Sequence, residues 1–382
     1  MREDWKYLPL GEICEFISGF TPQKHELNEK EGVPYYKVSD MNRNANSLYM
    51  EETELFVAHP RKTIPANSII FPKNGGAIFT GKKRILKYDS IIDLNTEAIN
   101  IKDKNIDLQF LYSFLLGIDF GQFDNGGGLP SINIRKMKEF IVPVPPLSEQ
   151  ERIVSLLDEQ FAKIDALKAN AASQLKATKD LFQSALKQLL TPQEGWERKM
   201  LKEVSTIIGG STPKTNDASN WEGNNNWVTP AELNGEKYYG KTKRTISDKA
   251  ARGMQLLPVG TVLLSSRAPI GKVAITTEPM YCNQGFKNIV CSNVLYNEYV
   301  YWYILFSVPL LEALGVGATF KELSKSKTEE FSISFPSLPE QERIAARLDE
   351  ISEKVKALQA NYDQTITLCN DLKQSLLKSI FA

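Results

Sequence analysis

Few side chains in this sequence have the type and spacing that enzymatic chemistry requires. The 382 residues include two histidines, His25 and His59, and no CxxC pair accompanies them, which argues against a zinc site. A Ser-His-Asp site would have to use one of these histidines, yet no GxSxG turn is present. We therefore predict no catalytic residue and no metal ligand in this chain.

Two motifs come near to nucleotide or cofactor sites. Residues 76–83 have the G-x4-G-K spacing of a phosphate loop, but Lys83 replaces the Ser or Thr that reaches magnesium, and residues 84–88 look like a strand. We interpret this segment as a basic turn. No Asn/Asp-Pro-Pro-aromatic tetrapeptide occurs, so the adenine-gripping motif of amino-group methyltransferases is missing. We predict no cofactor bound to this chain.

The composition is that of an ordinary water-soluble protein with room for two globular domains. Lys+Arg and Asp+Glu number 46 each, so net charge favours no partner, and a nucleic-acid binder would need its basic residues on one face. Four cysteines without pairing motifs and no signal peptide predict a reduced, cytoplasmic protein. The most apolar stretch, 299–311, is interrupted by Pro309, so we expect core helices there and at 110–116, and no membrane span.

The landmarks of the first half recur in the second half at a constant shift. Trp5 corresponds to Trp196, and the run EQERI at 149–153 recurs at 340–344, both 191 residues later. Two copies of one unit predict two similar binding surfaces related by a pseudo-two-fold axis. A DNA duplex is a natural partner for such a pair of surfaces.

Each half has the same internal order. Short apolar runs such as 68–71 and 261–264, separated by Gly, Pro and Asn, predict strands and loops with one or two helices. A proline-rich stop then precedes about 43 residues without internal Pro or Gly, which predicts a long helix, with Ser148 as the N-cap of the first. The expected fold class is α+β, with recognition domains and helices at residues 1–147, 148–191, 192–338 and 339–382.

Both long helices carry an apolar seam with alternating steps of four and three residues, which is typical of a coiled coil. We expect the two helices to pack on each other as an antiparallel pair. The alternatives are that each seam packs on its own globular domain or on another chain. The predicted seam residues are Ile153, Leu157, Ile164, Leu167, Ile344, Leu348, Ile351, Val355, Leu358 and Tyr362.

Basic residues gather at one place in each half. Residues 61–88 contain seven Lys or Arg and no acid before Asp89, and residues 237–277 contain eight against Asp248 alone. Such patches suit phosphate neutralisation, and Arg and Asn on loops suit base reading. The alternative is an ordinary solvated face. The candidate DNA-binding residues are Arg61, Lys62, Lys73, Asn74, Lys82, Lys83, Arg84, Lys241, Lys243, Arg244, Arg267 and Lys272.

The proline-to-helix motifs, VPVPPLSEQERI at 142–153 and FPSLPEQERI at 335–344, resemble those of the specificity subunit of type I restriction-modification systems. The domain starts at 10–22 and 201–213 resemble that family too, and the likeness covers the whole chain. The first copy departs from the pattern, because Tyr35 begins YYKV where the second has WVTP at 227–230. Different recognition domains should differ, so base-reading residues cannot be carried over.

The resemblance implies a chain without catalytic activity whose two domains each read one part of a split, asymmetric DNA site. The helices would fix the spacing and bind two modification subunits, which methylate adenine with S-adenosylmethionine. Restriction subunits would add ATP- and magnesium-dependent cleavage. One heptad inserted after Ala171 should then change the spacer only, and replacing Lys83 or Arg84 should weaken only the first half-site. The alternatives are a fused enzyme with its own active site and a coiled-coil scaffold that binds DNA non-specifically.

Overall fold

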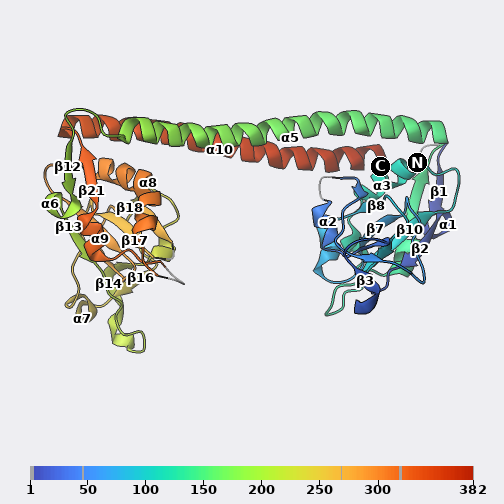
Figure 1. Ribbon diagram of the computed structural model, residues 1–382, viewed down its shortest axis with the longest axis horizontal. Helices are drawn as coiled ribbons and strands as arrows, with labels where there is room; N and C mark the ends of the chain where they lie inside the picture. Colours follow the sequence, from blue (N-terminus) through green and yellow to red (C-terminus); the bar gives the residue numbers. More distant parts are fainter. Residues whose placement is uncertain (1–3, 45–46, 268, 318–320, 382) are drawn as a thin grey trace. The chain divides into compact units, whose positions relative to one another are not determined.

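The computed structural model describes residues 4–44, 47–267, 269–317 and 321–381. The chain divides into unit 1, residues 1–171 with 364–382, and unit 2, residues 172–363 (Figure 1). Each unit therefore combines one globular domain with the end of one long helix and the start of the other. The predicted α+β class, with two recognition-type domains and two packed long helices, is confirmed.

The centre of unit 1 is a five-stranded sheet in the order β2-β10-β7-β8-β5. Apolar β-branched runs form its inner strands, and the Ile-Ile-Phe-Pro run of β7 is buried along its whole length, as expected of a strand covered on both faces. The strands are β2 (Cys14–Ser18), β5 (Tyr49–Met50), β7 (Ile69–Pro72), β8 (Arg84–Leu86) and β10 (Thr96–Ile101).

Unit 2 repeats this sheet in the order β13-β20-β17-β18-β15. The repeat extends to strand direction. The last strand in each order, β5 or β15, pairs in parallel with its neighbour, β8 or β18, and that neighbour pairs antiparallel with the next strand, β7 or β17. The strands are β13 (Ser205–Gly209), β15 (Tyr238–Tyr239), β17 (Val262–Ser266), β18 (Ile270–Thr276) and β20 (Lys287–Cys291). The strands predicted at 68–71 and 261–264 correspond to β7 and β17.

Smaller sheets complete each unit. The first and last strands of each globular domain form a two-stranded sheet: β1 (Lys6–Pro9) with β11 (Ile141–Val144), and β12 (Glu197–Met200) with β21 (Ser332–Phe335). The remaining sheets differ between the units. Unit 1 has β3 (Leu27–Asn28), β6 (Phe56–Val57), β4 (Val33–Tyr36) and β9 (Ile91–Ile92), and unit 2 has β16 (Arg244–Ile246), β14 (Trp221–Val228) and β19 (Tyr281–Cys282).

Short helices fill the gaps around these sheets. The apolar segments predicted to form core helices are α3 (Leu108–Leu116) and α8 (Asn297–Leu314), and α8 packs on β18. Among the described residues, no helix is long and apolar enough to cross a bilayer. The other α-helices are α1 (Leu10–Ile13), α2 (Asp40–Arg43), α4 (Ile134–Lys138), α6 (Leu201–Val204), α7 (Asp248–Ala251) and α9 (Lys325–Glu330); short 3-10 turns include η2 (Gly76–Thr80).

The two long helices are α5 (Leu147–Leu190) and α10 (Leu338–Phe381), and Ala382, predicted as the last helical residue, lies outside the described residues. Each helix starts one residue earlier than expected. The prediction of Ser148 as the N-cap is wrong, because Ser148 lies inside the first turn, where Glu149 and Gln150 donate backbone N–H bonds to the carbonyl of Pro146.

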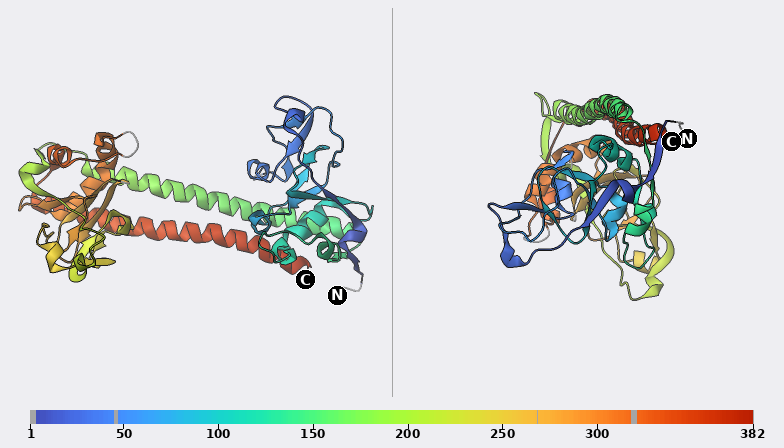
Figure 2. Two further views of the ribbon diagram at one scale, coloured as in Figure 1. Left: turned by 90° about the horizontal axis from the view of Figure 1, so that it is seen from below. Right: turned by 90° about the vertical axis from the view of Figure 1, so that its right-hand side faces the viewer.

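In each unit the two long helices lie side by side and run in opposite directions (Figure 2). In unit 1 the Lys373 ammonium is 2.6 Å from Asp165, and Lys168 donates a 2.8 Å hydrogen bond to Asn370. Higher residue numbers on α5 therefore face lower ones on α10, which defines an antiparallel pair. In unit 2, Leu186 on α5 belongs to the same apolar cluster as Leu348 on α10.

The predicted seam is right at eight of its ten positions, and the phase of the helices explains the other two. Eight of the predicted positions are buried or half-buried, but the side chains of Leu167 and Leu358 are 57% and 41% exposed. At those levels the helices instead turn Lys168 and Gln359 inward, one residue later in both copies. The covered seam is Leu157, Phe161, Ile164, Lys168, Ala171, Leu175 and Thr178 in α5, and Leu348, Ser352, Val355, Gln359, Tyr362, Ile366 and Cys369 in α10.

A buried glutamine joins each long helix to the globular domain that precedes it. In unit 1 the Gln150 side chain accepts a hydrogen bond from the backbone of Asp107 and donates to the carbonyls of Asn105 and Pro145. In unit 2 Gln341 makes the corresponding three bonds. Both side chains are fully buried, so each lost bond would leave a desolvated polar group.

Unit 2 has an additional polar clamp between α10 and its domain. The Lys237 ammonium, 11% exposed, lies 2.6 Å from Asp349 on α10 and 3.0 Å from Glu298 on α8. The Trp302 indole also donates to Asp349 over 3.1 Å. Lys237 belongs to the sequence-predicted basic patch, but its charge is neutralised within the fold.

Candidate nucleic-acid interface

The same loops converge beside the five-stranded sheet in both units. The loop after β2 turns at Gly19, and the loop after β13 turns at Gly210. A Cβ atom would lie 2.1 Å from the Asp93 carbonyl oxygen at Gly19 and 2.0 Å from the Cys282 carbonyl oxygen at Gly210. Only glycine permits this close approach, so both copies build the same loop framework and can vary the side chains on it.

Equivalent sheet positions in these frameworks carry opposite charges. Glu97 pairs across the sheet with Ser18, and Lys287 pairs with Gly209, 191 residues after Ser18. The Glu97 carboxylate, 2% exposed, accepts hydrogen bonds from Ser18 and from Lys73 at 2.7 and 2.8 Å. Burial lowers the pKa of Lys287, while Glu322 opposes that shift at 3.7 Å. Lys73 therefore neutralises Glu97 inside the fold, and the two copies share one framework while differing in the side chains placed on it.

The predicted candidates of unit 1 lie in different surroundings. Arg61 and Lys62 are exposed in the segment between β6 and β7. Lys73 and Asn74 directly follow β7, where Lys73 is held by Glu97 and Asn74 is half-buried beside Asn95. Lys82 is half-buried after η2. Of this set, Arg61 and Lys62 have the accessibility that a phosphate contact needs.

The prediction that Lys83 contacts DNA is wrong, because its side chain is buried. Lys83 is 1% exposed, donates a 2.9 Å hydrogen bond to the Ile118 carbonyl, and lies 4.0 Å from the centre of the Phe120 ring. Burial lowers the pKa of Lys83 to about 8, although Asp119 opposes this shift. An ammonium so placed supports the fold around η2 and cannot reach phosphate.

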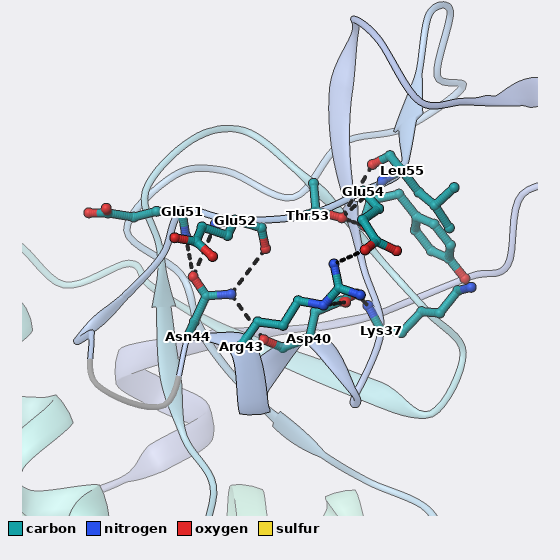
Figure 3. A network of polar contacts seen from close by, with 10 residues as sticks. Lys37, Asp40, Arg43, Asn44, Glu51, Glu52, Thr53, Glu54 and Leu55 are labelled. Carbon is teal, nitrogen blue, oxygen red and sulfur yellow. Dashed lines mark hydrogen bonds and ion pairs between the residues drawn. The ribbon is translucent and has the colours of Figure 1, made fainter.

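Arg84 is half-buried and tied to the backbone. Its guanidinium donates to the Asn44 carbonyl at 3.0 Å and to the Lys83 carbonyl at 2.7 Å. Asn44 in turn organises the 40–55 segment, since its side chain accepts from the backbone N–H groups of Glu51 and Glu52 (Figure 3). The carboxylates of this segment, with Glu54 paired to Arg43 at 2.6 Å, make it acidic and unsuited to phosphate.

Unit 2 presents its candidates more openly. Lys241, Lys243 and Arg244 are exposed at and before β16. Lys272 is half-buried, and its ammonium donates to the Pro230 carbonyl at 3.0 Å. Arg267 is half-buried beside the Asn283–Gly285 turn, where a Cβ on Gly285 would lie 3.4 Å from its Nε atom. The structure thus brings Arg267 to the convergent loops and exposes Lys241, Lys243 and Arg244 at or just before β16.

Two features that position these residues were not predicted. The first is the pair of buried glutamines, Gln150 and Gln341, each of which fixes a long helix to its domain. The sequence contains a signal for them, because a Glu-Gln pair is repeated at the start of both helices. The second is the pair of indoles at Trp221 and Trp227 beneath Arg244, of which the sequence shows only the proximity to a basic patch. Among the described residues, no three His, Cys, Asp or Glu side chains are grouped as metal ligands.

Comparison with known proteins agrees with this architecture. Residues 2–177 and 193–368 each match the family described as "Type I restriction modification DNA specificity domain", so the chain belongs to that family. Over 95% of its length it is 27% identical to the putative type I restriction enzyme MjaX specificity subunit of Methanocaldococcus jannaschii, covering 90% of that protein. The MjaIX specificity subunit of the same organism is 37% identical over 42% of this chain and 39% of its own length.

Solved structures share the fold at low sequence identity. A chain from a type I restriction-modification system, described for its complex assembly and conformational transition, matches all of this chain and 98% of its own with a TM-score of 0.83 and 21% identity. The HsdS subunit from Thermoanaerobacter tengcongensis matches with a TM-score of 0.62, at 21% identity, over 100% of this chain and 97% of that one. The chain is a DNA specificity subunit, a non-catalytic component, and its two recognition domains fit a bipartite site.

Proposed function

We propose that each unit reads one part of a split, asymmetric DNA sequence and that the paired long helices set the distance between the two parts. The observation that carries this proposal is the duplicated recognition framework, whose loops turn at Gly19 and at Gly210 and carry different side chains in the two copies. A duplicated framework would place two similar readers on one duplex, and the changed side chains would give each reader its own target.

The long helices supply a surface for partner subunits. Leu167 and Leu181 of α5 are 57% and 61% exposed, and their equivalents Leu358 and Leu372 of α10 are 41% and 53% exposed. Leu167 and Leu358 lie one residue before the seam positions Lys168 and Gln359. Leu181 and Leu372 lie one residue before the half-buried Phe182 and Lys373, which continue the seam by one step. Apolar residues beside a two-residue seam are typical of helices in a larger bundle. Since the surface occurs twice, it suits two copies of one partner.

In this proposal those partners are two modification subunits that methylate adenine with S-adenosylmethionine, joined by restriction subunits that use ATP and magnesium. The complex would act on cytoplasmic DNA, and this chain would supply the sequence reading without binding any of these cofactors. Base flipping and methyl transfer would belong to the modification subunits.

The test is a genome-wide map of adenine methylation in the native strain with this gene intact and deleted. The proposal predicts a split motif that is methylated in the intact strain and unmethylated after deletion. The control is the deletion strain carrying the gene on a plasmid, in which methylation of the motif should return. A methylation map that is the same in both strains, although the modification subunit is produced, would contradict the proposal.

A further inference from the structure

The exposed arginine of β16 rests on a built aromatic platform. The Arg244 guanidinium carbon lies 3.6 Å from the centre of the Trp221 ring and 5.5 Å from that of Trp227. The two indoles meet edge to face with centroids 5.1 Å apart. The contacts of this guanidinium within the described residues are with these rings. A stacked guanidinium keeps its N–H edge free, whereas an ion-paired one has already used it.

The backbone is shaped to hold this platform. Trp221 and Asn225 both face Ile246 across the β14–β16 pair, so residues 222–224 form a bulge. Glu222 within it has a left-handed φ of 60°, and a Cβ on Gly223 would lie 2.2 Å from the Ile246 carbonyl oxygen. Bulges that aim a side chain, and strained residues within them, concentrate at functional sites.

Hydrogen bonds fix each member of the platform. The Trp227 indole donates to the Ser211 carbonyl at 3.1 Å, and the Trp221 indole donates to the Lys214 carbonyl at 3.3 Å. The Thr242 hydroxyl, in turn, donates to the carbonyl of Arg244 at 2.7 Å. The arginine is therefore positioned both through its backbone and through the face of its side chain.

From this geometry we infer that Arg244 reads a guanine in the half-site bound by unit 2, an inference that rests on the proposed function. The planar fork of arginine matches the O6 and N7 acceptors that guanine displays in the major groove, and a pre-positioned fork loses little freedom on binding. The neighbouring Lys241 and Lys243 are exposed and can contact nearby phosphate. In unit 1 the residue that corresponds to Trp227, 191 positions earlier, is Tyr36. Its buried hydroxyl donates a hydrogen bond to the Met50 carbonyl.

The experiment compares methylated motifs written by the full system carrying wild-type chain, Arg244→Lys, Arg244→Gln or the control Lys202→Gln, which changes an exposed cation of α6 outside the basic patch. We expect a guanine in one half of the wild-type motif to become degenerate in both Arg244 variants, while the other half and the control motif stay unchanged. Wild-type chain that writes no motif would count against the proposed function. If both Arg244 variants methylated the same motif as the wild-type chain, the guanine assignment would be overturned, but the proposed function would not.

A second measurement leaves the protein unaltered and so does not depend on the folding of a variant. Duplexes in which that guanine is replaced by 7-deazaguanine lack the N7 acceptor. Wild-type complex should bind them about tenfold more weakly than the natural site, which is the scale of one base-edge contact. Equal binding of the two duplexes would overturn the inference.

Discussion

Gln150 and Gln341, 191 residues apart, make the same three hydrogen bonds, each fixing the start of a long helix to the loop before the core helix of its own unit. The bonds join the carbonyl oxygen and the two N–H donors of a fully buried side chain to backbone groups of the two neighbouring segments. A repeated polar lock of this kind sets the direction in which each long helix leaves its domain, because the side chain fits only one arrangement of the two segments.

Replacing either glutamine should therefore destabilise its own unit. We expect Gln150→Ala or Gln341→Ala to lower the free energy of unfolding by about 1–3 kcal/mol, since three backbone groups lose their hydrogen-bond partner. Urea unfolding followed by circular dichroism measures the loss. Gln183→Ala, at an exposed position of α5, is the matched control and should change stability little. Similar losses in all three variants would refute the lock.

The clamp of unit 2 should be sensitive to acid. Although burial opposes its ionisation, the hydrogen bonds from Tyr238 and Lys237 hold the pKa of Glu298 below its usual 4.5. A carboxyl with a lowered pKa contributes stability above that value and loses it as pH falls through the folded-state pKa. We expect Lys237→Met to cost about 1–3 kcal/mol at neutral pH, with a smaller difference from wild type in acid.

The control for the clamp is Lys249→Met, which breaks the exposed ion pair with Asp217. Exposed pairs contribute at most about 1 kcal/mol, so this variant should stay close to wild type at each pH. Equal free energies of unfolding for Lys237→Met and Lys249→Met, measured in urea, would show that the clamp does not stabilise unit 2.

The buried ammonium of Lys83 predicts a dependence on alkaline pH. Its folded-state pKa of about 8 lies below the usual 10.5, so between these values the unfolded chain holds a proton that the folded chain has released. The free energy of unfolding should therefore rise with pH across this window. Lys83→Met should remove that rise and leave DNA binding intact. Lys82→Met is the control for the pH dependence and should keep the rise. A loss of DNA affinity confined to Lys83→Met would contradict the buried placement.

The exposed leucines of the long helices should govern assembly and not folding. The double variant Leu167→Glu with Leu358→Glu should abolish binding of the modification subunits, because it places charge where apolar contact is needed. The control, Ala169→Glu with Ala360→Glu, changes exposed positions two residues further along each helix. Co-purification measures binding, and circular dichroism confirms that both variants keep their helices. Normal co-purification of the leucine variant would exclude this surface.

The sequence predicts much of the architecture because the repeat, the proline stops and the length of the helices are all local features. The strands β7 and β17 and the core helices α3 and α8 lie where the apolar runs indicated. The seam was harder, since a 3.5-residue period can pass through Leu167 or through Lys168. Apolarity favoured Leu167, but the structure instead turns the half-buried Lys168 toward α10, where its ammonium donates to Asn370. Leucine on a partner-binding face is indistinguishable in sequence from leucine in a seam.

The basic patches show a second limit of the sequence. A count of Lys and Arg cannot tell that Lys83 is buried, that Lys73 neutralises Glu97, or that Lys237 holds Asp349, because each partner is distant in sequence. Arg244, in contrast, stays exposed and is held by two indoles, which a bulge places beneath it. Contacts of this kind arise from tertiary structure, so composition alone cannot rank the candidates.

Lengthening both helices together tests most directly whether they set the distance between the two half-sites. One heptad inserted after Ala171 and another after Tyr362 keeps the seam in phase and adds about 10 Å to each helix, or about three base pairs of DNA. The methylated motif of a strain carrying this chain should keep both half-sites and gain a longer spacer between them. A change in the bases of either half-site, or an unchanged spacer written by the lengthened chain, would contradict the account.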